Sequence, residues 1–154
     1  MKLLPALVLT IASTLAGADC PDTPAAGALF DRLAGAWNGR ASVTPVGPRP
    51  YDIRFERRDR NWIYGSAEPG AAIHHWGFYC RDGGLQLRFL STFRGNRDPT
   101  LLDAVEISDD RLVFQAREPE FLRVVVTPGR EQSRFEVLHH GKRHVLIKLE
   151  RTSP

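Results

Sequence analysis

Apolar and polar residues alternate in short segments along most of the chain. In 35–43 the apolar Trp37 and Val43 lie an even number of positions apart, and in 51–56 apolar and charged residues take turns. A period of two is typical of β-strands that bury one face. Turn residues such as Asp-Gly-Gly at 82–84 separate the segments. The segments predicted as strands are 35–43, 51–56, 62–66, 73–81, 85–89, 102–107, 112–117, 121–126, 135–139 and 145–151.

This series predicts an all-β fold, a single antiparallel up-and-down barrel of about ten strands. So many strands must close or stack, because a long open sheet would leave exposed edges. The length of 154 residues suits one domain, which we place at 29–154. Leu29, Phe30 and Leu33 have helical spacing, so a short helical turn is expected before the first strand. Residues 19–28, rich in Pro and Ala, are predicted to form an extended leader.

The N-terminus has the order of parts found in an export signal. Lys2 precedes an apolar run at 3–15, and Ala16-Gly17-Ala18 then offers a small-residue cleavage site. The run is shorter than the roughly 20 apolar residues that span a bilayer, so we predict no transmembrane anchor. Residues 1–18 are therefore interpreted as a cleavable signal peptide, and the mature protein as periplasmic or extracellular.

The two cysteines bear on whether the exported protein is lipidated and whether it contains a disulfide. Cys20 follows the signal closely, but the acidic Asp19 before it does not suit a lipidation site, so soluble export is favoured over a lipoprotein. An oxidising compartment favours a disulfide between Cys20 and Cys80. Two unpaired thiols are the alternative, because sequence does not show whether the two residues come close together.

Charge argues against a nucleic-acid partner. The chain has 21 basic and 18 acidic residues, a formal net charge of +3, and no run of five or six like charges. Nucleic-acid binding normally needs a clustered basic face.

No sequence motif indicates catalysis. The chain lacks G-x-S-x-G, C-x-x-C, H-E-x-x-H and a glycine-rich phosphate loop. Its carboxylates fall at turns or alternate with apolar residues, as on solvated strand faces. Adjacent histidines at 74–75 and 139–140 would point to opposite faces, so neither pair alone converges on a metal ion. We expect neither an enzyme nor a resident metal from the residues themselves.

Aromatic residues cluster in the middle of the chain and supply either a packed core or the wall of a ligand cavity. A barrel of this strand number can enclose one small ligand. The hypothetical cavity wall consists of Trp62, Tyr64, His74, Trp76, Phe78 and Phe89.

The opening of the first strand, Leu33-Ala-Gly35-Ala-Trp37-Asn-Gly39, resembles the G-x-W signature of lipocalins and related calycin-type barrels. The chain also ends similarly, with Arg151 in the last predicted strand. The resemblance implies that Arg151 packs over Trp37 at the closed end of the barrel, and makes both structural residues. A guanidinium is suited to this, because it stacks on an indole while donating to backbone carbonyls.

A narrower resemblance is to nitrobindin-like heme-binding barrels. Leu33, Gly35, Trp37 and Gly39 match their opening, and the spacing of His144 to Leu149 and Arg151 matches their last strand. This resemblance implies heme as cofactor and His144 as its axial ligand. Strand parity opposes it, because an undistorted strand would point His144 away from the face of Val145. A bulge or twist near Gly141 would be needed.

Three functional hypotheses follow. The first is an exported barrel that holds a small apolar or amphipathic molecule. The second is a nitrobindin-like heme-binding barrel. The third is an envelope protein that acts through protein contacts, with the barrel filled by its own side chains.

Overall fold

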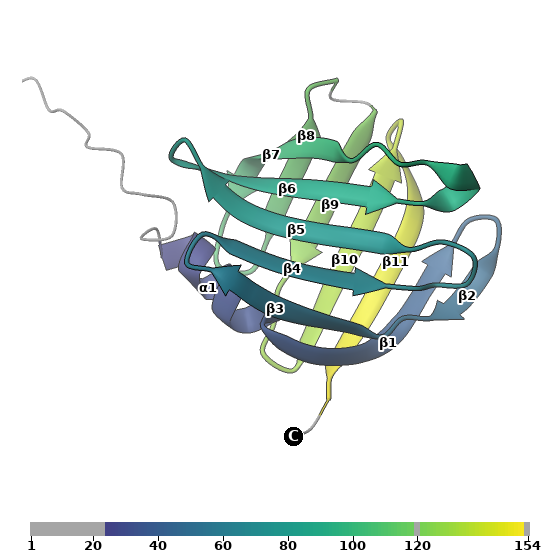
Figure 1. Ribbon diagram of the computed structural model, residues 1–154, viewed down its shortest axis with the longest axis horizontal. Coiled ribbons are helices and arrows are strands. Elements are labelled where there is room, and N and C mark those ends of the chain that lie inside the picture. The colour runs from purple at the N-terminus through teal and green to yellow at the C-terminus, as the bar shows by residue number, and fades with distance from the viewer. Residues whose placement is uncertain (1–23, 119–120, 153–154) are drawn as a thin grey trace, which may run out of the picture.

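The computed structural model describes residues 24–118 and 121–152, and within these ranges the chain forms eleven strands and two short helical segments. Figure 1 shows the strands wrapped around one interior, with the helix α1 at one end. In chain order the elements are α1 (Pro24–Leu33), β1 (Gly35–Val43), β2 (Gly47–Pro50), β3 (Ile53–Asp59), β4 (Trp62–Ala67), β5 (His74–Arg81), β6 (Gly84–Ser91), the 3₁₀ turn η2 (Phe93–Gly95), β7 (Thr100–Ile107), β8 (Leu112–Ala116), β9 (Leu122–Thr127), β10 (Gln132–His139) and β11 (Lys142–Arg151).

The sheet closes on itself, as predicted. Neighbouring strands pair antiparallel in the order β11 to β3, then β1 and β2, and β1 also pairs with β11 from Trp37↔Arg151 to Val43↔Val145. In the part of the chain that the structure describes, ten strands thus form a closed barrel, with β2 as an extra strand. The predicted all-β barrel of about ten strands is confirmed.

The strand β2 was not predicted. The sequence predicts no strand between 43 and 51, where prolines at 45 and 48 are expected to stop the first strand. In the structure, Gly47–Pro50 pairs with the second half of β1, from Val43↔Gly47 to Arg40↔Pro50. Proline is tolerated in a strand whose other edge is unpaired, because no ladder hydrogen bond is lost there.

The helix begins earlier than predicted. α1 covers Pro24–Leu33, so residues 24–28 of the predicted extended leader are helical, and that prediction was wrong for them. Proline fits a first helical turn, where its missing N–H is not needed, and alanine favours a helix. Ala26, Leu29, Phe30 and Leu33 are buried against the barrel. The signal peptide at 1–18 and Cys20 lie outside the described residues, so the cleavage and the disulfide remain predictions.

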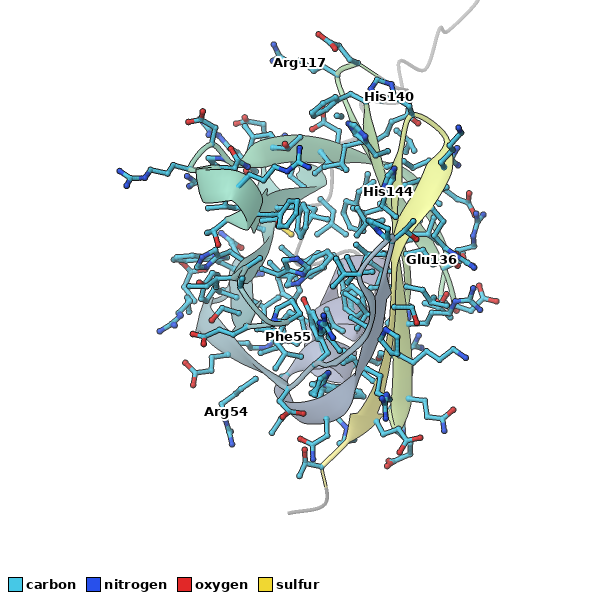
Figure 2. The ribbon with its side chains drawn as sticks, turned by 90° about the vertical axis from the view of Figure 1, so that its right-hand side faces the viewer. Arg54, Phe55, Arg117, Glu136, His140 and His144 are labelled. Carbon is cyan, nitrogen blue, oxygen red and sulfur yellow. The ribbon has the colours of Figure 1, made fainter. Side chains whose placement is uncertain are left out.

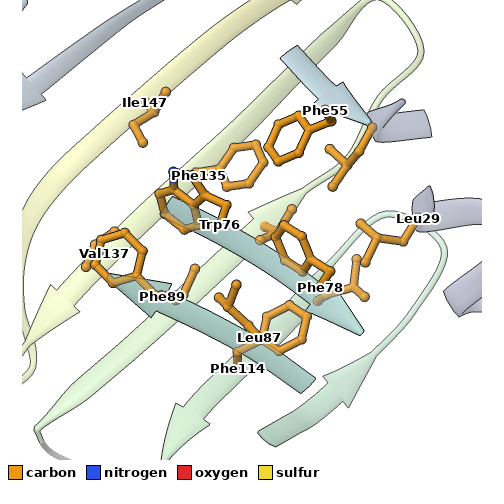
Figure 3. Packing of buried hydrophobic residues seen from close by; sticks show 14 of the residues in the cluster. Leu29, Phe55, Trp76, Phe78, Leu87, Phe89, Phe114, Phe135, Val137 and Ile147 are labelled. Carbon is orange, nitrogen blue, oxygen red and sulfur yellow. The ribbon is translucent and has the colours of Figure 1, made fainter. Parts of the chain in front are cut away.

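The barrel interior is filled by aromatic and aliphatic side chains. Figure 2 shows Phe55 inside the barrel and Arg54 outside it, which is the alternation of a strand with one buried face. Ring centres of Trp76 lie 4.5 Å from Phe89 and 5.2 Å from Phe135, and Phe78 lies 5.5 Å from Phe114 (Figure 3). The contacts of Trp76 with Phe135 and of Phe78 with Phe114 join strands that are not neighbours in the sheet, so the interior is a packed core.

Hydrogen bonds between the end of α1, the start of β1 and the end of β11 close the end of the barrel beside α1. Trp37 is buried and its indole N–H donates to the carbonyl of Leu33, at 2.7 Å. The guanidinium of Arg151 donates to the carbonyls of Ala34, at 2.8 Å, and Arg32, at 2.6 Å. The helix, the first strand and the last strand are therefore held together at one point.

Candidate functional site

The six residues expected to form one cavity wall lie on opposite faces of the sheet. His74, Trp76, Phe78 and Phe89 are buried in the barrel interior. Trp62 and Tyr64 lie on the outer face of β4, where Trp62 is 40% exposed. The expectation of a single wall is therefore wrong. The buried positions of β4 are instead Ile63, Gly65 and Ala67.

One polar group lies within the apolar interior. The hydroxyl of Tyr51 accepts a hydrogen bond from the indole N–H of Trp76, at 2.7 Å, and lies 3.1 Å from Nδ1 of His74. All three side chains are buried. A neutral histidine with its proton on Nε2 can accept a hydrogen bond from the Tyr51 hydroxyl at Nδ1, so this hydroxyl can donate to His74 while it accepts from Trp76.

Burial keeps this interior group neutral. Desolvation, together with the neighbouring charge of His75, lowers the pKa of His74 to about 4. Burial raises the pKa of the Tyr51 hydroxyl well above its usual value, and the hydrogen bond from Trp76 lowers it only in part. Near neutral pH both side chains therefore remain uncharged, as suits a place inside the core.

His144 lies beside a distortion of the barrel wall. The pairing of β10 with β11 shifts between Val137 and Leu138, and His144 is left between the partners Arg143 and Val145. A β-bulge or irregularity of the pairing is thus present at His144, near Gly141. Its half-buried side chain packs against His139, with ring centres 5.6 Å apart, at the hairpin end seen in Figure 2.

The buried residues next to His144 belong to the hydrophobic core. Val137 and Val145, the buried pair next to the bulge, are part of the packed cluster with Trp76 and Phe135. A heme inside the barrel would have to displace those side chains. In the described ranges no group of three or more His, Cys, Asp or Glu side chains is arranged to hold a metal ion.

A groove of about 550 Å³ lies over the outer surface of β4, β5 and β6. This volume is within the usual range for a small-molecule site, about 300–1,000 Å³. The groove is lined by Asp59, Asn61, Trp62, Tyr64, His75, Gly77, Tyr79, Cys80, Arg81, Arg88, Leu90, Arg97 and Pro99.

Aromatic rings form one side of this groove. Trp62 pairs across the strands with Tyr79, and its ring meets that of Tyr64 edge-on at 6.3 Å. Tyr64 stacks on His75 at 6.1 Å, and its hydroxyl lies 2.6 Å from Nδ1 of His75. The rings are therefore fixed in position by contacts with one another.

Gly77 forms the floor of the groove. Its cross-strand neighbours are Tyr64 on β4 and Arg88 on β6. It has no side chain, so the rings and the arginine around it enclose a hollow. A Cβ added there would lie 3.4 Å from the indole nitrogen of Trp62.

The groove carries an excess of positive charge. Three arginines and one aspartate line it. Arg81 pairs with Asp82 at 3.4 Å. Within residues 24–118 and 121–152, no carboxylate forms an ion pair with Arg88 or Arg97. Two guanidinium groups are thus available beside the aromatic wall.

The sequence contained a sign of this groove. In the predicted strands 62–66 and 73–81, every second residue faces away from the core. Trp62, Tyr64 and Tyr79 are at such positions. Aromatic residues at solvent-facing positions on adjacent strands indicate a surface with a role besides packing. The sequence alone did not show which face of each of these strands is buried in the barrel.

No known family model matches the sequence, and no curated protein sequence matches it. Among solved structures, a redesigned β-barrel is similar over 81% of this chain and 96% of its own, at 11% sequence identity and a TM-score of 0.49. A likeness at this level carries no information on function. The closed barrel agrees with the calycin-type resemblance, and no particular family is shown.

The described residues contain no helix long and apolar enough to cross a membrane.

Proposed function

We propose that this protein is an exported barrel that binds a small amphipathic molecule, and that its site is the groove on the outer face of β4–β6. The observation that carries the proposal is the aromatic wall of Trp62, Tyr64 and Tyr79, which lines the groove together with Gly77. A concave apolar surface with a few converging polar groups is the usual form of a small-molecule site.

The packed interior favours this location over the inside of the barrel. A ligand among Trp76, Phe89 and Phe135 would have to break ring contacts that stabilise the fold. A ligand in the outer groove displaces only water. Trp62 already presents a large part of its indole ring to solvent, so covering that surface is favourable.

The filled interior would also suit a protein that acts through protein contacts. The groove favours a small ligand instead, because protein interfaces are typically large and fairly flat, whereas these side chains surround a compact hollow.

The amphipathic dye 1-anilinonaphthalene-8-sulfonate tests the proposal. We expect the folded protein to give a saturable rise in dye fluorescence, and Trp62→Ala to reduce the affinity at least tenfold. Phe121→Ala is the matched control, because Phe121 is 41% exposed, almost the same as Trp62, but does not line the groove. It should leave dye binding unchanged.

A second variant separates the groove from the interior. Gly77→Val places a branched side chain on the groove floor, pointing away from the core, and valine is favoured in strands. It should block the dye while circular dichroism and the melting temperature stay close to wild type. Equal dye binding by Trp62→Ala, Gly77→Val and wild type would overturn the proposal.

A further inference from the structure

We infer that the groove selects planar aromatic anions, with Arg88 and Arg97 binding the anionic group while the rings hold the flat part. This inference rests on the proposed function, since it specifies the ligand class of that same groove. It is carried by Arg88 and Arg97, which have no ion-pair partner among the described residues and line the same groove as the exposed rings.

The strand pairing fixes the geometry around Gly77. Along the sheet, Tyr64, Gly77 and Arg88 lie side by side on β4, β5 and β6. Two residues along each strand, Trp62 on β4 pairs with Tyr79 on β5, and both side chains face outward. A flat molecule in the groove beside Gly77 would therefore meet aromatic side chains from β4 and β5 and the guanidinium of Arg88 from β6.

Outward-facing register partners also lie on the other side of Gly77. They are Ser66 on β4, His75 on β5 and Leu90 on β6. Leu90 and Pro99 line the groove with Arg97. Arg97 belongs to the segment between η2 and β7, so the guanidinium groups of Arg88 and Arg97 come from different parts of the chain that border one groove.

The charges determine which ligand fits. Arg88 and Arg97 lack carboxylate partners among the described residues, whereas Arg81 has Asp82. Among the described residues that line the groove, Asp59 is the one acid, and one of its carboxylate oxygens accepts a hydrogen bond from the backbone N–H of Asn61, at 2.6 Å. An anion in the groove would therefore supply the counter-charge that the arginines lack.

Guanidinium and aromatic groups have complementary preferences that define the ligand class. A guanidinium is planar and binds carboxylate or phosphate through two parallel hydrogen bonds. Exposed indole and phenol rings favour flat apolar partners in stacked or edge-on contact. The ligand is thus a fused or single aromatic ring system with one carboxylate or phosphate, of a size that fits about 550 Å³.

Three compounds that share one ring system test this: 2-naphthoate, 2-naphthyl phosphate and the neutral 2-naphthamide. Isothermal titration calorimetry with the folded protein should show at least one of the two anions binding at least tenfold tighter than the amide. The tighter anion identifies the acid group. Raising the salt concentration should weaken the anions and leave the amide unchanged, because screening acts only on the charged pair.

Substitutions assign the charge preference to particular residues. Arg88→Gln and Arg97→Gln should each weaken the preferred anion at least threefold, and together bring it to the affinity of the amide. The affinity of the amide itself should not change. Arg123→Gln removes an arginine that lies outside this groove, on the exposed side of β9, and should leave all three affinities unchanged.

The outcomes separate this inference from the proposed function. Equal binding of all three compounds, unaffected by Arg88→Gln and Arg97→Gln but lost in Trp62→Ala, would retain the groove as a ligand site and overturn the anion preference. Absence of binding by every compound, or binding that Trp62→Ala does not weaken, would overturn both.

Discussion

The guanidinium carbon of Arg151 lies 4.2 Å from the centre of the Trp37 ring, which joins the last strand of the barrel to the first. The same two residues are register partners in the β1–β11 pairing. The contact is therefore a cation–π interaction located at the seam where the barrel closes.

Replacing Trp37 by alanine should cost about 3–5 kcal/mol of unfolding free energy, because a fully buried aromatic side chain is lost and a cavity is left. Chemical denaturation measures this directly. Trp62→Ala is the control: its indole is 40% exposed, and the loss there should stay below about 1 kcal/mol. Equal losses in the two variants would mean that Trp37 does not anchor the seam.

Arg151→Lys tests whether the planar fork matters as well as the charge. The guanidinium donates to the carbonyls of Arg32 and Ala34 at once, and a lysine ammonium cannot reproduce that geometry. We expect a loss of about 1–3 kcal/mol, measured by denaturation, because at least one carbonyl is left without its donor. The same change at the exposed Arg123 should alter stability by less than about 0.5 kcal/mol.

Two strand glycines should respond differently to alanine. A Cβ at Gly39 would lie 2.1 Å from the backbone oxygen of Lys148, so β11 would have to move at the seam. A Cβ at Gly77 has its nearest neighbour, the indole nitrogen of Trp62, at 3.4 Å. Gly39→Ala should cost about 1–3 kcal/mol or more, as overpacking does. Gly77→Ala should be neutral or slightly stabilising, because glycine is unfavourable in strands.

Thermal unfolding of the two variants side by side checks this. A Gly39→Ala protein as stable as Gly77→Ala would contradict the close approach of β1 and β11.

The barrel was predictable because its cause is local. Alternation such as Ile53, Phe55 and the charged residues between them sets which face of a strand is buried, and turn residues set where strands end. The seam was predictable too, since Gly35, Trp37 and Arg151 stand at the two ends of the domain. These features depend on residues a few positions apart, or on a signature shared by a large class of barrels.

The candidate site was not predictable in the same way. Trp62 and Ile63 are both apolar, so the pattern of β4 alone did not decide which of them turned inward. That choice depends on the register with β3 and β5, where Ile63 pairs with Phe78 and Trp62 with Tyr79. The bulge beside His144 likewise depends on how two strands meet. The pairing between strands therefore determines which side chains of β4 face the core and where the bulge lies, and the pattern within one strand does not.

The buried His74 should make the stability of the protein depend on pH. Its pKa is about 4 in the folded protein and about 6.5 in an unfolded chain. Between these values the unfolded chain binds a proton that the folded protein does not, so stability falls as the pH decreases through this window. The full effect of this one group is about 3 kcal/mol, since each pKa unit corresponds to about 1.4 kcal/mol.

His74→Gln removes the titrating group while keeping a polar side chain next to the Tyr51 hydroxyl. Unfolding free energies measured from pH 7 to pH 4 should therefore fall less steeply in this variant than in wild type. Carboxylates and other histidines titrate in both proteins, so the difference between the two curves isolates His74. His140→Gln, the same change on the exposed hairpin turn, should leave the wild-type slope intact. Parallel curves for wild type and His74→Gln would show that His74 is not held neutral by the core.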